Sequence, residues 1–337
     1  MSTQIIRFGI LGAGDIAHKF IDAVRQTEVG EVAAVASKDL QRAKAWSERE
    51  HLENYYGSYD ELLADPQIDA IYIATTTNAH YENILQCLRA GRHVLCEKSL
   101  VRSYEEAQEV CALAKEKKLF LMEAMWSRFL PKTTTVRNWI AQGRIGKVNL
   151  IQATIGWKAD PVYNKRLFLP ELGGGALYDI GIYPLELIPY LVNQKIVDIQ
   201  PLMRYHSTGV DDISSLNLRL EDCFANIQCS FTTKLPEDVY IYGEEGYIRI
   251  PKIHYGNSAF LYDHGDEIID SFQGGGENGF IYQVEEVIHC IKNGQTESAV
   301  CPHKMTLDAA KWIDIIHRNF QNTHHHPSSD VQRQVFR

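Results

Sequence analysis

The sequence lacks three features that would mark a nucleic-acid-binding or membrane protein. It has no excess of basic residues, since 34 Lys and Arg stand against 43 Asp and Glu, which gives a net charge of −9. A duplex-binding protein normally carries a basic face, so we expect no nucleic-acid partner. No apolar run approaches the ~18 residues that a membrane helix needs. The first residues also run into a strand-like segment without a charged leader, and we therefore expect a soluble, cytoplasmic protein.

The sequence also lacks motifs for disulfides, metals and several kinds of enzyme. Its seven cysteines are odd in number and include no C-x-x-C pair, which predicts reduced thiols. No H-E-x-x-H, Walker or nucleophile-elbow motif is present. The three adjacent histidines His324, His325 and His326 have no partner motif and lie in a polar end. We therefore expect no metal site.

The composition is that of an ordinary globular protein. Apolar residues make up 45% of the chain and charged residues 23%. A chain of 337 residues is longer than one core comfortably holds, so two domains are expected.

Short apolar runs alternate with stretches of helical spacing in the first part of the chain. The expected strands are Ile5–Leu11, Glu31–Ala36, Ile68–Ala74, His93–Cys96 and Leu119–Glu123, and the expected helices are 15–27, 39–50, 79–90 and 103–118. This alternation, with short turns, predicts a parallel sheet covered on both faces. We assign residues 1–124 to this α/β domain.

The pattern of expected elements changes after Glu123. In the following part of the chain, strand-like segments follow one another about every ten residues. The expected strands are Val148–Trp157, Val197–Tyr205, Ile213–Leu220, Phe224–Phe231, Val239–Tyr242 and Tyr247–Ile250, and the expected helices are 132–142, 178–193, 278–293 and 303–320. Alternating strands of this kind predict an antiparallel sheet. We assign residues 125–320 to this second domain and residues 321–337 to a polar tail.

A glycine motif directly follows the first strand and directly precedes the first helix. The run Gly12-Ala13-Gly14-Asp15-Ile16-Ala17 fits G-x-G-x-x-A. Gly12 permits a tight turn, Gly14 lets the backbone approach a pyrophosphate, and the small Ala17 lets the helix pack on the strand. The helix N-terminus then offers free N–H groups to an anion. The motif predicts dinucleotide binding; the alternative is a glycine-rich turn in another kind of α/β protein.

The end of the second strand bears on which dinucleotide is bound. NAD enzymes usually place a carboxylate there for the ribose 2′-hydroxyl, whereas this chain has Ser37 and Lys38. Lys38, with Arg42, is suited to a 2′-phosphate, while Asp39 is better interpreted as the start of the next helix. We therefore favour NADP over NAD, the alternative being that Lys38 and Arg42 are plain surface charges.

Four further motifs, taken together, resemble one family. They are Thr76-Thr77-Asn78-Ala79-His80, Glu97-Lys98, Glu123-Ala124-Met125-Trp126-Ser127-Arg128-Phe129, and the stretch from Leu172-Gly173-Gly174-Gly175 to Asp179-Ile180-Gly181-Ile182-Tyr183. In their order and spacing the chain resembles the Gfo/Idh/MocA oxidoreductases over about residues 5–320. It is most similar to the branch with dimeric dihydrodiol dehydrogenases and NADP-dependent D-xylose dehydrogenases.

The resemblance implies a Rossmann domain followed by an α+β domain with an open, mostly antiparallel sheet. It implies a homodimer or homotetramer that associates through the open sheet. It further implies an NADP-dependent dehydrogenase, with NAD as the other possible cofactor. Such an enzyme transfers hydride between nicotinamide and a secondary alcohol or ketone of a sugar, a polyol or a trans-dihydrodiol.

Two positions depart from the family pattern. Ser99 stands where the family has Pro after Glu-Lys, so the backbone beside Lys98 is less constrained. The family's Asp-x-x-x-His appears here as Asp179-x-x-x-Tyr183, which replaces one proton donor by another.

Lys98 and Tyr183 are the expected proton-transfer pair, with Asp179 as a third catalytic residue. Neither a free tyrosine (pKa ~10) nor a free lysine (pKa ~10.4) is a good base at neutral pH. A cation beside the phenol is expected to lower the pKa of Tyr183, and desolvation to lower that of Lys98. Asp179, four residues before Tyr183, is expected to orient substrate hydroxyls or Lys98, unless it only caps a helix.

Other residues are expected around the pocket. Those expected near the cofactor, besides the glycine motif, are Thr75, Thr76, Asn78, His80, Glu97, Trp126, Arg128 and Tyr282; those expected near substrate are Trp126, Phe129, Trp157 and Arg166. Each also has a purely structural interpretation, as a packed or surface residue.

Two other functions are weighed against the dehydrogenase. A non-catalytic NADP-sensing regulator would keep the glycine motif and bind a protein partner through the open sheet. The presence of both Lys98 and Tyr183 argues against it, since a sensor needs no proton-transfer pair. A hydrolase that uses bound NAD transiently is the third hypothesis.

Overall fold

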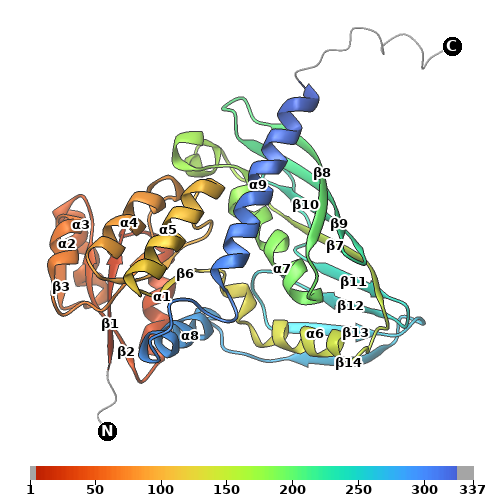
Figure 1. Ribbon diagram of the computed structural model, residues 1–337, viewed down its shortest axis with the longest axis horizontal. Coiled ribbons are helices and arrows are strands. Elements are labelled where there is room, and N and C mark those ends of the chain that lie inside the picture. Colours follow the sequence, from red (N-terminus) through yellow and green to blue (C-terminus); the bar gives the residue numbers. More distant parts are fainter. Residues whose placement is uncertain (1–4, 325–337) are drawn as a thin grey trace.

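The computed structural model describes residues 5–324, with side chains up to residue 318, and it contains two sheets. The first has the strand order β3-β2-β1-β4-β5-β6, and the second has the order β14-β13-β12-β11-β7-β10-β9-β8. The sheets lie at opposite ends of an elongated molecule (Figure 1). A parallel sheet followed by a mostly antiparallel one is the predicted fold class, which is confirmed.

All pairs of the first sheet are parallel. Its strands are β1 (Ile6–Leu11), β2 (Gly30–Ala36), β3 (Asn54–Tyr56), β4 (Ala70–Ile73), β5 (His93–Cys96) and β6 (Leu121–Glu123). The connecting helices are α1 (Asp15–Arg25), α2 (Leu40–Glu50), α3 (Tyr59–Ala64), α4 (His80–Arg89) and α5 (Tyr104–Lys117).

Burial explains why the central strands consist of unbroken apolar residues. Every residue of β4 is buried, and so are the last four residues of β1. A strand covered by helices on both faces has no solvent side, so its sequence does not alternate. The helix ends follow local chemistry: Asp39 caps α2 by accepting from the backbone N–H groups of Gln41 and Arg42, as predicted. Gly91, with φ of 76°, follows the end of α4.

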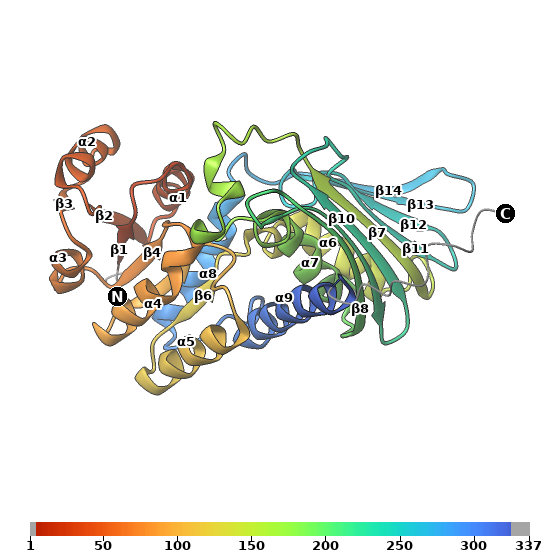
Figure 2. The same ribbon diagram turned by 90° about the horizontal axis from the view of Figure 1, so that it is seen from above.

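The second sheet is antiparallel except for the central pair β10–β7. Its strands are β7 (Val148–Gly156), β8 (Ile196–Tyr205), β9 (Asp211–Leu220), β10 (Phe224–Ser230), β11 (Val239–Gly243), β12 (Tyr247–Ile250), β13 (Ser258–Tyr262) and β14 (Ile268–Gln273). The helices α6 (Pro131–Ala141), α7 (Ile182–Val192) and α9 (His303–His324) lie against one face of this sheet (Figure 2).

The last part of the chain returns to the first domain. Helix α8 (Phe280–Lys292) packs against α1, and α9 packs against both α5 and β8 (Figures 1 and 2). A side chain added at Gly30 in β2 would meet Ile288 of α8 at 2.9 Å, so this contact is close. The domain boundary near residue 124 stays a prediction, because residues after it complete the covering of the first sheet.

Short helical turns carry several of the functional residues. They are η1 (Thr77–Ala79), η2 (Trp126–Arg128), η3 (Lys165–Phe168), η4 (Pro170–Leu172) and the π-helical turn η5 (Leu177–Gly181). The expected helix 178–193 is thus a π-turn followed by α7. Helix α7 continues through Pro189 to Val192, although a proline inside a helix usually kinks or breaks it.

Four elements were not predicted from the sequence: β3, α3, β13 and β14. Helix α9 extends to His324, beyond the expected end at residue 320. His325 and His326 lie outside the described residues. All seven cysteines are buried and free of disulfides, as predicted. Within residues 5–324 no helix is both long and apolar enough to cross a membrane.

Candidate active site

A cavity of about 750 Å³ lies at the carboxyl ends of the parallel strands. Thirteen of the predicted site residues line it: Gly12, Gly14, Asp15, Ile16, Ser37, Lys38, Arg42, Thr75, Thr76, Glu97, Lys98, Arg166 and Asp179. Ala13, Lys19, Tyr59, Ala74 and Thr77 line it as well. Ligands of open α/β sheets bind at this edge.

The glycine turn is shaped for close approach of the backbone. Gly12 has φ of 98°, and a Cβ there would lie 2.9 Å from the Thr75 side chain. The following helix α1 has Gly14 as its N-cap and no side-chain cap, so no side chain competes with an anion for its first N–H groups. Ala17 is fully buried and does not line the cavity, in agreement with its predicted packing role. The residues present therefore fit a pyrophosphate.

Cations gather where the ribose 2′ position of a dinucleotide is expected. Lys38 and Arg42 both line the cavity, and the Lys38 ammonium lies 5.8 Å from the centre of the Tyr59 ring. The Arg42 guanidinium donates to the backbone oxygen of Ala13 at 2.7 Å, which ties it to the glycine turn. The carboxylates among the described lining residues are Asp15, Glu97 and Asp179, and none follows β2. This end of the cavity suits a phosphate better than a ribose hydroxyl.

Lys98 joins the two domains at the other end of the cavity. Its ammonium donates to the backbone oxygen of Asp179 at 2.5 Å and to the Asp179 carboxylate at 3.2 Å. The same ammonium lies 5.1 Å from the centre of the Tyr183 ring. Arg166 donates to the Asp179 carboxylate at 3.1 Å from the second domain. The structure thus brings together the three residues predicted to be catalytic.

The protonation of this group differs from the expectation. Burial raises the pKa of Tyr183 although Lys98 opposes the shift, so the predicted lowering is wrong. Burial by itself would lower the pKa of Lys98, but the Asp179 carboxylate and Tyr183 raise it overall. Lys98 and Arg166 in turn lower the pKa of Asp179 despite its burial. At neutral pH the site therefore holds an ammonium, a carboxylate and a neutral phenol.

A carboxylate from the second sheet holds the glycine-rich turn that carries Asp179. The Asp211 carboxylate accepts from the backbone N–H of Leu177 and from the Ser214 hydroxyl, each at 2.8 Å. A Cβ at Gly175, which has φ of 123°, would lie 2.5 Å from Asp211. Because Gly175 has no side chain, the backbone can approach this carboxylate closely.

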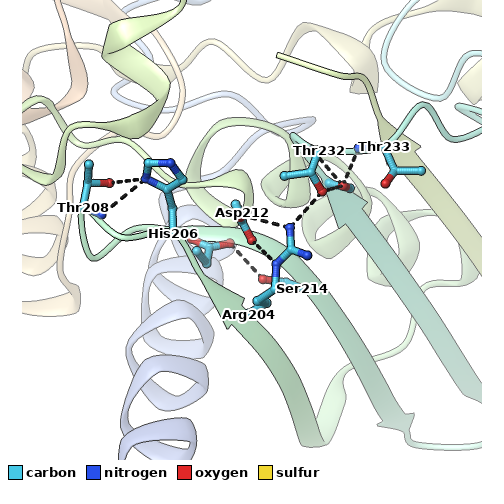
Figure 3. Close-up of polar contacts among 9 residues, drawn as sticks. Arg204, His206, Thr208, Asp212, Ser214, Thr232 and Thr233 are labelled. Atoms are coloured by element: carbon cyan, nitrogen blue, oxygen red, sulfur yellow. Dashed lines mark hydrogen bonds and ion pairs between the residues drawn. The ribbon is translucent and has the colours of Figure 1, made fainter. Parts of the chain in front are cut away.

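The neighbouring Asp212 has a different partner. Arg204 of β8 donates two hydrogen bonds to the Asp212 carboxylate, at 2.9 and 3.1 Å, and a third to the Thr232 hydroxyl (Figure 3). Consecutive side chains of a strand point to opposite faces. Asp211 therefore supports the catalytic turn while Asp212 ties β9 to β8.

The loop of Lys98 is fixed by hydrogen bonds, although Ser99 lacks the ring of proline. The Ser99 hydroxyl donates to the Tyr178 backbone oxygen at 2.9 Å. The backbone N–H of Leu100 donates to the Glu123 carboxylate at 2.8 Å. The His80 ring contacts the backbone oxygens of Ser99 at 2.9 Å and Thr75 at 3.1 Å. The buried His80 therefore links the two cavity-lining loops instead of lining the cavity itself.

Tyr183 is 6% exposed, is not among the residues that line the cavity, and lies among aromatic side chains. The Trp126 indole donates to its hydroxyl oxygen at 3.2 Å. The His254 ring lies 4.8 Å from the Tyr183 ring, and burial lowers the pKa of His254 to about 4. His254 therefore adds a neutral imidazole to the site. Sequence reasoning missed it because it lies in an irregular loop with no motif around it.

The remaining predicted residues lie away from the cavity. Asn78 accepts from the Thr76 hydroxyl, and Tyr282 accepts from the Gly276 backbone. Phe129 packs on the core, and Trp157 packs 5.3 Å from Phe231. Arg128 is buried and lies 3.3 Å from Glu186 as an ion pair. None of these five residues is among those that line the cavity.

Comparison with known proteins agrees with this geometry. Residues 6–125 match the model of the oxidoreductase family with an NAD-binding Rossmann fold, and residues 133–249 match the GFO/IDH/MocA C-terminal domain. The chain belongs to the Gfo/Idh/MocA oxidoreductase family. As a member of this family it is an oxidoreductase that uses a nicotinamide dinucleotide, as the sequence predicted.

Relatives and solved structures of the family resemble the chain over most of its length. Trans-1,2-dihydrobenzene-1,2-diol dehydrogenase of Mus musculus is 33% identical and covers 88% of this chain and 91% of its own length. The Danio rerio protein of the same name is 33% identical over 92% of this chain and 95% of its own. A 3-ketoreductase from Actinomadura kijaniata, solved with NADP and TDP-benzene, has a TM-score of 0.85 at 24% identity. The match covers 94% of this chain and 98% of the ketoreductase chain. An aldose-aldose oxidoreductase from Caulobacter crescentus has a TM-score of 0.86 at 23% identity. The match covers 95% of this chain and 98% of the oxidoreductase chain.

Proposed function

We propose that the protein is an NADP-preferring dehydrogenase or reductase that interconverts a secondary alcohol and the corresponding ketone. The substrate classes are sugars, polyols and trans-dihydrodiols. The main support is the position of the Lys98 ammonium, which contacts Asp179 and faces the Tyr183 ring at the inner end of the cavity that begins at the glycine turn. The relatives named for dihydrodiol oxidation support the choice of substrate class.

Each residue of the site has a separate role in the proposed reaction. Nicotinamide, when bound, supplies or accepts hydride. The Tyr183 hydroxyl transfers the proton to or from the substrate oxygen, because it is the neutral phenol of the site. The Lys98 ammonium stabilises the phenolate that forms as the proton leaves. Asp179 holds Lys98 in place, and Arg166 holds Asp179 from the other side.

The protonation of Lys98 and Tyr183 suits proton donation to a carbonyl. Both Lys98 and Tyr183 carry their protons at neutral pH, so the site starts ready to give a proton to a carbonyl oxygen. Oxidation of an alcohol starts from the phenolate, which is the rarer state of Tyr183.

The test is the Tyr183→Phe variant in a screen of pentoses, hexoses, inositols and dihydrodiols, followed by nicotinamide absorbance with each cofactor. We expect kcat to fall by about 100-fold to 10,000-fold while the Kd for NADP stays unchanged, because only the proton donor is lost. Tyr190→Phe is a matched control, since Tyr190 lines a different cavity. Full activity of Tyr183→Phe would assign the proton transfer to another group.

The location and the assembly of the protein belong to the same proposal. Seven free, buried thiols support a cytoplasmic location. One face of the eight-stranded sheet is covered by α6, α7 and α9, and no helix of residues 5–324 covers the other (Figure 2). That face carries exposed Leu150 and Phe224, which are paired in register across β7 and β10. A second copy of the chain on this face supports a homodimer, or a homotetramer built from two such pairs.

A further inference from the structure

A second cavity, of about 660 Å³, lies on the helical side of the second domain. It is formed by residues of η2, α6, α7 and the start of α9 together with the turn after α7. It shares no lining residue with the cavity of the glycine turn. Its size falls within the range of small-molecule sites, about 300–1,000 Å³.

The charge of this cavity is opposite to that of the whole chain. The protein has a net charge of −9, yet the lining has five cations and three carboxylates. Two of the cations are paired: Arg128 lies 3.3 Å from Glu186, and Lys304 lies 2.5 Å from Asp308. The other three are Arg137, Lys195 and Lys311, and no carboxylate of the described residues lies within ion-pair distance of any of them.

Arg137 is held in a fixed orientation. Its guanidinium carbon lies 4.0 Å from the centre of the Tyr190 ring, and that of Arg128 lies 4.9 Å from the same centre. Stacking on an aromatic ring orients the flat guanidinium and leaves its N–H edge free. A guanidinium edge matches the two oxygens of a carboxylate or a phosphate.

The rest of the lining is apolar and includes one indole. It consists largely of Leu185, Pro189, Ile196, Pro302, Met305 and Trp312. Such walls bind a hydrocarbon or aromatic body by removing it from water. An inorganic ion would leave these walls uncovered, and a neutral apolar molecule would leave the three cations unpaired.

We infer that this cavity is a second ligand site, which binds a small organic anion with one carboxylate or phosphate group on an apolar body. The anionic group is bound by Arg137, with Lys195 and Lys311 nearby, and the apolar body packs against Trp312 and Leu185. The inference is independent of the substrate and of the activity at Lys98.

The test is isothermal titration calorimetry on the full chain saturated with NADP, which fills the other basic cavity. The probes are phenylacetate, phenyl phosphate and the neutral phenylacetamide. We expect one equivalent of either anion to bind, and phenylacetamide to bind at least about tenfold more weakly, since it lacks the charge-assisted hydrogen bonds. Comparison of the two anions tells whether carboxylate or phosphate is preferred.

Two variants and one control locate the site. Arg137→Gln is expected to weaken binding of the anions by about tenfold or more, and Lys311→Gln by a smaller factor in the same direction. Lys115→Gln, on an exposed position of α5 outside both cavities, is expected to bind as the wild type does. Displacement of the anions by NADP, unchanged binding by both variants, or no binding of either anion at millimolar concentration would overturn the inference.

Discussion

At the scale of single residues, the choice of cofactor depends on two cations that follow β2. Lys38 and Arg42 line the cavity, and Arg42 is anchored to the glycine turn through Ala13. Tyr59 adds a ring beside Lys38. These positions are what a 2′-phosphate requires, and they lack the carboxylate that a free ribose hydroxyl would favour.

Lys38→Asp is expected to raise the KM for NADP by about tenfold or more and to shift the preference toward NAD, because it replaces a phosphate partner by a ribose partner. Steady-state kinetics with both cofactors measures the shift. Lys44→Asp makes the same charge change on an exposed face of α2 that does not line the cavity, and it is expected to have no such effect. An unchanged preference in Lys38→Asp would place the 2′-phosphate elsewhere.

The pH dependence of the reaction rate also depends on single residues. The pKa of Tyr183 and that of Lys98 are raised, and the pKa of Asp179 is lowered, so none of the three changes its charge near neutral pH. The proton-donating form of Tyr183 is present below its raised pKa and is lost only above it. We therefore expect kcat/KM for ketone reduction to stay level from about pH 6 to about pH 9 and to fall in stronger alkali.

In the oxidising direction, kcat/KM is expected to rise with pH, because it depends on the phenolate of Tyr183. Rate profiles in both directions, measured with saturating cofactor, check the sign. A reduction rate that already falls between about pH 6 and about pH 8 would require a different proton donor.

At the scale of elements, the site depends on how tightly the turn before α7 is held. Gly175 lies against the Asp211 carboxylate, which accepts from Leu177 and thereby fixes η5 and Asp179. Ser99 and Glu123 fix the opposite loop, which carries Lys98. Two separately anchored loops thus define the distance between the ammonium and the phenol.

Gly175→Ala is expected to lower the free energy of unfolding by about 1–3 kcal/mol and to lower kcat, since the added Cβ would lie 2.5 Å from Asp211. Thermal unfolding and steady-state kinetics measure the two effects. Gly143→Ala is the matched control: its φ is also positive, at 69°, but nothing lies within 4 Å of the added carbon. Equal kinetic effects of both variants would contradict a role of the Asp211 contact in the site.

The elements also show which parts of the fold can be predicted from the sequence. The buried strands β1, β4 and β5 were predicted because unbroken apolar runs between helical segments allow few other structures. β3 has only three residues, and β14 has no buried residue, so neither shows a pattern that could be recognised.

Some residues of the candidate site could likewise be predicted from the sequence, and others could not. The glycine turn, Lys38 and Lys98 follow strands, and Asp179 lies in the glycine-rich motif before α7, so each stands in a recognisable pattern. Lys19 lies one turn after Asp15 on α1, and helical spacing alone would have placed it beside the cavity. His254 and the protonation of Tyr183 were not predictable, because both depend on which side chains from distant segments become buried together.

At the scale of the whole molecule, the bare face of the second sheet requires an explanation. Tyr242 pairs in register with both Leu150 and Tyr247, and Tyr247 pairs with Tyr262, so rings and apolar side chains are adjacent across several strands. Phe224, the first residue of β10, is 60% exposed and pairs with Leu150. A contiguous apolar surface of this kind is typical of a subunit interface.

Phe224→Asp is expected to convert the proposed homodimer to monomer, because it places a charge where two copies meet. Analytical ultracentrifugation measures the change. Tyr163→Asp removes a side chain that is 87% exposed in the loop after β7 and is expected to leave the assembly unchanged. A wild type that is already monomeric at micromolar concentration would contradict the proposal.

The packing of α8 on α1 has a consequence for synthesis of the chain. The glycine turn and its sheet leave the ribosome before α8, the helix that covers the flank of α1, because α8 is formed by residues 280–292. Until then Gly30 and its neighbours lack the contact with Ile288. The nucleotide-binding half is therefore begun before the second sheet and completed only after it, and a fragment cut after residue 124 would expose a flank of α1 that α8 covers in the full chain.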